Sequence, residues 1–169
     1  MTGWMTAAAG LIGAVVVALT ATHVIGGSSG QPNTTLRDWA ASANKICARS
    51  NDTIAALPKP ESIGKNTAEA VNLIRTAVTI QRQMLRELTA LMPPEGKERQ
   101  VTQFLHTGAE MSGVSSELLD DLILRDVSGV RRRAAELSQI SNKFNHAATN
   151  LGATTCAEGG TASDVFGGG

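Results

Sequence analysis

The first 36 residues of this chain contain no Asp, Glu, Lys or Arg. All fifteen basic and all fifteen acidic side chains lie from Arg37 onward, so the formal net charge is zero. Binding to nucleic acid requires Lys and Arg in clustered excess, which a neutral chain of this kind does not provide. We therefore expect no nucleic acid among its partners.

Aromatic residues and catalytic motifs are also scarce. The chain has two Trp, three Phe and no Tyr, which argues against stacking platforms for bases. It contains no nucleophile elbow, phosphate loop or zinc motif. Its histidines, His23, His106 and His146, show no metal-ligand pattern, and we expect the last two on the surface. The sequence thus predicts a non-catalytic protein without a cofactor or a bound metal.

Uncharged residues dominate the N-terminus. The 22 residues Trp4–Ile25 would form a helix of ~33 Å, long enough to cross a hydrocarbon core of ~30 Å. We predict a membrane anchor within residues 1–25. A signal peptide cleaved near Gly27 or Ser28 is the alternative, although the segment lacks the usual basic start and small-residue cleavage site.

The remaining chain divides by composition. Residues 26–35 are rich in Gly, Ser and Thr, as in flexible linkers. Residues 36–156 carry apolar side chains at helical spacing. Residues 157–169 lack apolar periodicity, and we expect them to form a disordered tail.

Apolar periodicity and helix breakers predict an all-α domain. The expected helices span residues 36–57, 66–92, 95–124 and 130–151, with a turn at 126–129. Their short connections favour an antiparallel up-down four-helix bundle. The fold class is therefore a single N-terminal transmembrane helix followed by that bundle.

Cap residues mark both ends of the domain. Thr35 stands three residues before Asp38, so its hydroxyl is placed to accept a hydrogen bond from the first helical turn. Gly152 follows the last helix, where glycine commonly serves as a C-terminal cap.

The two cysteines are placed to pair. Cys47 lies roughly 16 Å along the first helix, and Cys156 lies five residues beyond Leu151, which extended chain spans in roughly 16 Å. In an up-down bundle these two points meet, so we predict a disulfide. Two free thiols are the alternative. A disulfide would indicate an oxidising compartment.

Charge and cysteine content give opposite orientations for the anchor. Arg37, Lys45 and Arg49 follow the apolar segment while no basic side chain precedes it, which favours a cytoplasmic domain. The predicted disulfide favours the outside. We give the cysteines more weight and expect a single-pass cell-membrane protein with an extracytoplasmic domain, or a secreted domain if the segment is cleaved.

Several motifs carry a resemblance. Residues 43–58 read ANKICARSNDTIAALP, Leu85, Leu88 and Leu91 precede Pro93-Pro94, and residues 151–156 read LGATTC. With these motifs the chain resembles uncharacterised actinobacterial exported or membrane-anchored helical proteins that share one cysteine pair. The resemblance covers about residues 36–156 and implies location and fold, but no activity.

One basic cluster is a candidate binding patch. Arg131, Arg132 and Arg133 are consecutive and would suit an anionic partner. The alternative is pairing with Asp120, Asp121 or Asp126 across the predicted turn, which would offset the unfavourable helix-dipole placement of these charges.

Two functional hypotheses remain. The first is a membrane-tethered, non-catalytic helical module that binds a partner in the cell envelope. The second is an exported helical domain that binds an apolar small ligand between its helices.

Overall fold

The computed structural model describes residues 34–58 and 67–158, which belong to one compact unit spanning residues 32–169. The predicted anchor (1–25) and residues 26–33 of the predicted linker lie outside the described residues. No helix in the described part is long and apolar enough to cross a membrane.

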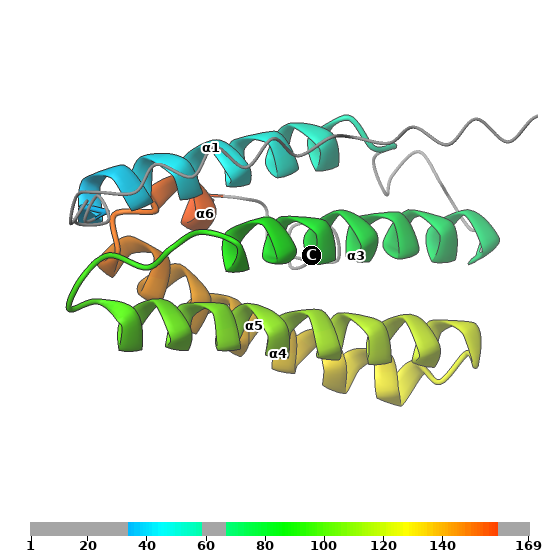
Figure 1. The fold of residues 1–169 in the computed structure, drawn as a ribbon. Coiled ribbons are helices and arrows are strands. Elements are labelled where there is room, and N and C mark those ends of the chain that lie inside the picture. The colour runs from blue at the N-terminus through cyan, green and yellow to red at the C-terminus, as the bar shows by residue number, and fades with distance from the viewer. Residues whose placement is uncertain (1–33, 59–66, 159–169) are drawn as a thin grey trace, which may run out of the picture. The chain divides into compact units, whose positions relative to one another are not determined.

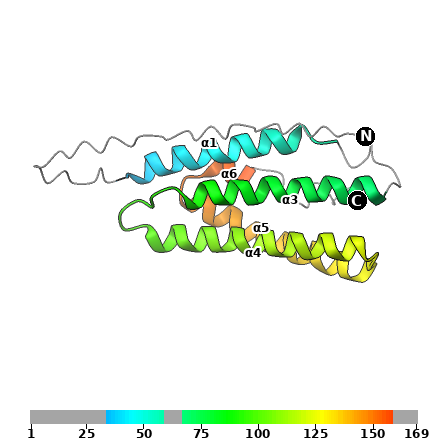
Figure 2. The same cartoon turned by 45° about the vertical axis from the view of Figure 1, so that its right-hand side comes forward.

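Four long helices pack side by side, as Figures 1 and 2 show. They are α1 (Leu36–Ala55), α3 (Thr67–Thr89), α4 (Glu98–Ile123) and α5 (Val127–Asn150). Neighbours along the chain run antiparallel, with α1 against α3, α3 against α4 and α4 against α5. The predicted all-helical domain of four packed helices is confirmed. The Thr35 cap is present too, because Thr35 Oγ1 accepts a 3.1 Å hydrogen bond from Asp38 N.

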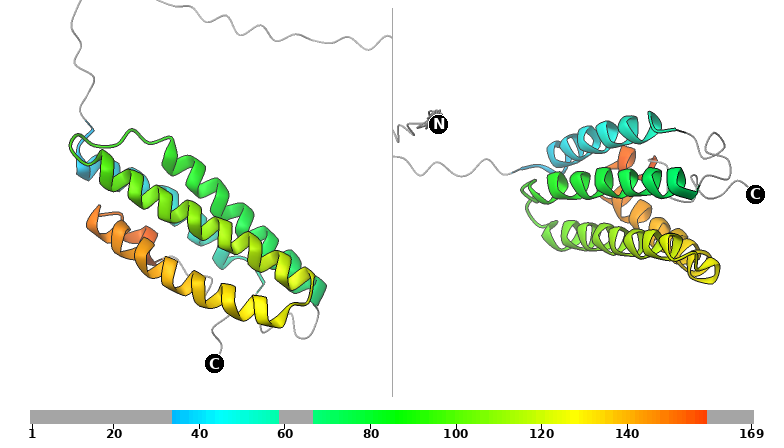
Figure 3. Two further views of the ribbon diagram at one scale, coloured as in Figure 1. Left: turned by 90° about the horizontal axis from the view of Figure 1, so that it is seen from below. Right: turned by 90° about the vertical axis from the view of Figure 1, so that its right-hand side faces the viewer.

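A short helix at the end of the described residues corrects the expectation of an extended return. Residues Thr154–Glu158 form α6, which packs against both α1 and α5 (Figure 3). The reversal into α6 occurs at Gly152, whose φ of +74° suits a residue without Cβ. Ala157 and Glu158 therefore belong to the domain rather than to the predicted tail, whose residues 159–169 lie outside the described residues.

Two asparagines of α1 hold α6 through its backbone. Asn44 donates from Nδ2 to the Gly152 carbonyl (3.1 Å) and accepts at Oδ1 from Thr155 N (2.9 Å). Asn51 donates to the Thr155 carbonyl (3.0 Å). Side-chain amides carry both donors and acceptors, so they satisfy polar backbone groups that a five-residue helix leaves unpaired.

The predicted disulfide is confirmed. Cys47 of α1 is bonded to Cys156 of α6, with a Cα–Cα distance of 5.0 Å and a sequence separation of 109 residues. Both cysteines are buried, within a cluster at the same end of the bundle as α6. Such a bond is typical of proteins in oxidising compartments.

Aromatic side chains join helices beside this disulfide. Trp39 of α1 meets Phe104 of α4 edge to face, with ring centroids 6.1 Å apart. Phe104 stacks on Phe144 of α5 at 4.6 Å. A second, smaller cluster between α4 and α5 lies nearer their connecting turn and consists of Val114, Leu118, Leu137 and Ile140.

Close packing around α4 depends on one glycine. A Cβ at Gly108 would overlap the Leu85 side chain and lie 3.2 Å from Phe144 Cε2. A side chain at this position would displace the Leu85 methyl group and press on the Phe144 ring. Gly113, one and a half turns further along α4, has no atom within 4 Å of such a Cβ.

We predict that Gly108→Ala destabilises the domain by ~0–2.5 kcal/mol, the difference between two opposing effects. Overpacking typically costs ~1–3 kcal/mol, which exceeds the ~0.5–1 kcal/mol that alanine gains over glycine within a helix. Gly113→Ala is the matched control and should stabilise by ~0.5–1 kcal/mol, because only the helix preference changes. Chemical denaturation of the full chain measures both, and an equal change in the same direction would contradict the packing account.

We predict that replacing both cysteines by alanine lowers the free energy of unfolding by ~2–5 kcal/mol. The bond closes a loop of more than a hundred residues, and its loss returns entropy to the unfolded chain. Reducing the wild-type chain is the control, since it breaks the same bond without changing a residue type. Unchanged denaturation midpoints in both experiments would show that the bond adds no stability.

Candidate functional site

The turn between α4 and α5 is shorter than expected. Residues 126–129 were predicted to form it, but α5 begins at Val127, so the reversal is confined to residues 124–126. Arg125 takes φ +57° there, a left-handed conformation uncommon for a residue with a side chain. Asp126 N donates to the Asp121 carbonyl at 2.9 Å, which closes the end of α4.

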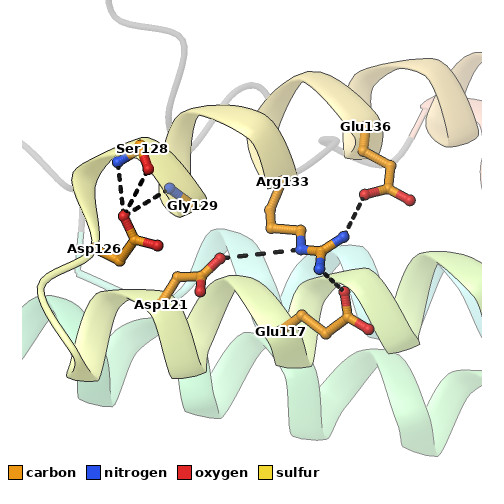
Figure 4. Close-up of polar contacts among 7 residues, drawn as sticks. All are labelled: Glu117, Asp121, Asp126, Ser128, Gly129, Arg133 and Glu136. Carbon is orange, nitrogen blue, oxygen red and sulfur yellow. Dashed lines mark hydrogen bonds and ion pairs between the residues drawn. The ribbon is translucent and has the colours of Figure 1, made fainter.

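Asp126 is the N-cap residue that directly precedes α5 (Figure 4). Its Oδ1 accepts hydrogen bonds from Ser128 N (3.1 Å), Gly129 N (3.0 Å) and Ser128 Oγ (2.8 Å). The hydrogen bond from Gly129 is the largest cause of a lowered pKa at Asp126, because these donors favour the charged carboxylate. Asp126 therefore fixes the direction in which α5 leaves the turn.

Arg133 ties the two helices together beyond the turn (Figure 4). Its guanidinium lies 2.9 Å from Glu117 of α4 and 2.8 Å from Glu136 of α5. Its Nε lies 4.0 Å from Asp121 Oδ2, too far for a hydrogen bond, and both of these buried atoms lack a hydrogen-bond partner. The hydrogen bond to Glu136 is the largest cause of the raised pKa of Arg133.

Gly129 allows Asp121 to lie against α5. A Cβ at position 129 would come within 2.6 Å of Asp121 Cγ. Glycine at this position therefore leaves room for the Asp121 carboxylate, which lies 4.0 Å from Arg133 Nε.

The three consecutive arginines have different surroundings. Arg133 pairs with acids on both helices, whereas Arg131 and Arg132 are exposed. Arg132 contributes electrostatically to the lowered pKa of Asp126. Cross-hairpin pairing thus involves Arg133, while Arg131 and Arg132 remain accessible as a candidate binding patch.

Exposed apolar side chains gather at the same end of the hairpin. Ile123, Leu124 and Val127 are 51, 75 and 64 % exposed, and we call these three residues the hairpin tip. Apolar periodicity did not predict their exposure, although the adjacent residues Ile123 and Leu124 depart from the helical spacing of the other apolar residues of α4. Large contiguous apolar patches mark interaction sites, which makes the hairpin tip a candidate contact surface.

A groove of about 430 Å³ lies between α1 and α3. Ile46 of α1 and Ile80 and Met84 of α3 supply its apolar lining. Arg49 Nη2 bonds to Glu87 Oε2 across the two helices at 2.6 Å. This volume is in the range of small-ligand sites.

The histidines lie apart from both features. His106 and His146 are exposed, and His106 Nδ1 lies 3.4 Å from Glu110 Oε1 one helical turn away. Within the described residues, no cluster of His, Cys, Asp or Glu is suited to hold a metal ion.

Comparison of the chain with protein-family models, curated proteins and solved structures gives no match. The resemblance to actinobacterial exported proteins therefore rests on sequence motifs alone. Among the motifs that carry the resemblance are the two cysteines, which form a disulfide in the structure.

We predict that Asp126→Ala lowers the free energy of unfolding near neutral pH, because the substitution removes the N-cap of α5. The folded-state pKa of Asp126 is lowered, so its contribution is complete above the ordinary Asp range and disappears as the pH falls through the lowered pKa. The difference between variant and wild type should shrink accordingly in acid.

Asp120→Ala is the control for this measurement. Asp120 is exposed on the last turn of α4, and its removal should change stability by less than about 0.5 kcal/mol. Equal losses from the two substitutions, or an Asp126 effect that persists unchanged in strong acid, would contradict the capping role.

Proposed function

We propose that this chain is a non-catalytic module, tethered to the cell membrane by its N-terminal segment, whose extracytoplasmic helical domain binds a protein of the cell envelope. The observation that carries the proposal is the hairpin tip, with three large apolar side chains exposed together. Three such residues at one end of a domain are better explained as a contact surface than as scattered exposed residues.

The surroundings of the hairpin tip suit a protein partner. Arg125, Arg131 and Arg132 are exposed nearby and form no ion pair within the described part of the chain. The same region also carries one exposed carboxylate, that of Asp120. An apolar centre with arginines at its rim is the usual composition of a protein interface. The complementary surface is an apolar depression bordered by acidic side chains.

The position of the hairpin tip also supports the proposal. The chain enters the domain at Leu36, and α1 begins at the end of the bundle opposite the α4–α5 turn (Figure 1). Helix α4 has 26 residues, which at 1.5 Å per residue separates the two ends by ~39 Å. A tether joined at Leu36 therefore leaves the hairpin tip accessible to a partner.

The disulfide supports the location. A buried bond between Cys47 and Cys156 is stable in the oxidising space outside the cytoplasm and rare within it. If the N-terminal segment were cleaved instead of retained, the same domain would be secreted.

We predict that a photo-cross-linking amino acid at position 124, in the full chain in its native membrane, forms one defined protein adduct. Leu124 is the most exposed large apolar residue in the described part of the chain and should lie at the centre of the contact. Leu124→Asp should reduce partner affinity by about tenfold or more, as for an interface hot spot.

Met92 provides the matched control. It is a large apolar residue with a similar exposure of 55 %, but it follows α3 at the end of the bundle far from the hairpin tip. A cross-linker at Met92 should not give the adduct. Identical adducts from positions 92 and 124, or none from position 124, would overturn the assignment of the hairpin tip as the binding surface.

A further inference from the structure

The groove between α1 and α3 combines an apolar lining with a polar edge. Ile46, Ile80 and Met84 line it together with side chains that carry hydrogen-bonding or charged groups. Those polar members are Arg49, Ser50, Thr53, Thr79, Gln83, Arg86 and Glu87. Small-molecule sites have this composition, with apolar walls and a few polar groups that orient the ligand.

Ser50 has a hydroxyl without a partner. The residue lines the groove and is 7 % exposed, yet its Oγ has no hydrogen-bond partner in the described structure. A buried polar group left unpaired is destabilising and uncommon in native proteins. This hydroxyl is therefore an unpaired polar group in a residue that lines the groove.

The charges at the edge favour an anion. Glu87 is already engaged, because it accepts hydrogen bonds from Gln83 (2.8 Å) and Arg49 (2.6 Å). The Gln83 bond is the largest cause of its lowered pKa, so Glu87 is ionised at neutral pH. Arg86 donates to the Gln83 side chain and forms no ion pair among the described residues. The groove therefore has two guanidiniums for one carboxylate.

We propose that the α1–α3 groove binds a single-chain fatty acid. The alkyl chain lies on Ile46, Ile80 and Met84, and the carboxylate pairs with Arg86. Guanidinium groups match carboxylates in geometry as well as in charge. This site is separate from the hairpin tip, and its occupancy does not depend on a protein partner.

The test uses the full chain in lipid nanodiscs with two photoactivatable probes, a laurate and the corresponding lauryl alcohol. The laurate probe should label peptides that contain Ile46, Ile80 and Met84, and excess laurate should suppress this labelling. The alcohol has the same chain without the charge, so it should label the same peptides several-fold less efficiently.

Three variants assign the carboxylate contact. Arg86→Met should reduce labelling by the laurate probe about fivefold to tenfold, the usual effect of losing a hydrogen bond to a charged group at an exposed site, with little change for the alcohol. Glu87→Gln should increase laurate labelling, because it removes the competing carboxylate from Arg49. Arg75→Met is the control on α3, since exposed Arg75 does not line the groove.

Equal labelling by laurate and alcohol, insensitivity to Arg86→Met, or labelling confined to other peptides would overturn the proposal. Arg86 is exposed, so its replacement should preserve the fold. Unchanged circular dichroism and an intact disulfide in each variant would show that altered labelling reflects the groove itself.

Discussion

The arrangement of the domain depends on the bond between Cys47 and Cys156. Helix α6 has five residues, too few to be stable alone, yet it packs against both α1 and α5. The disulfide holds it there by linking α6 to α1, and the side chains of Asn44 and Asn51 form hydrogen bonds with the backbone of Thr155 in α6. Helix α1, which otherwise packs mainly on α3, is thereby connected to the far side of the bundle.

The two ends of the domain differ in their packing and in their exposed side chains. At one end the disulfide, Trp39 and the stacked Phe104 and Phe144 form the larger core cluster. At the other end the α4–α5 hairpin extends with a smaller cluster and is held by the Asp126 cap and the ion pairs of Arg133. The larger buried cluster thus lies toward the end where α1 begins, while Ile123, Leu124 and Val127 are exposed at the remote end. The partner contact proposed for the hairpin tip would therefore leave the core undisturbed.

Much of the fold could be predicted from local physical rules. Apolar spacing located four helices, Thr35 and Gly152 marked helix ends, and simple lengths along helix and chain brought Cys47 and Cys156 together. The predictions that failed concern short segments. The start of α5 at Val127 depends on the hydrogen bonds of Asp126 to its own turn, and α6 depends on tertiary contacts with α1 and α5. The hairpin tip and the groove could not be predicted, because residue spacing does not tell which apolar side chains find a neighbouring helix to cover them.

The central claim is that this domain is closed by a disulfide in an oxidising compartment. The most direct measurement is thiol trapping of the native protein in intact cells, with acid quenching, denaturation, treatment with a maleimide reagent and intact-mass analysis. The account predicts that no maleimide adds to Cys47 or Cys156 unless the denatured chain is first reduced, after which both react. Two alkylated cysteines without reduction would contradict the covalent closure and, with it, the location outside the cytoplasm.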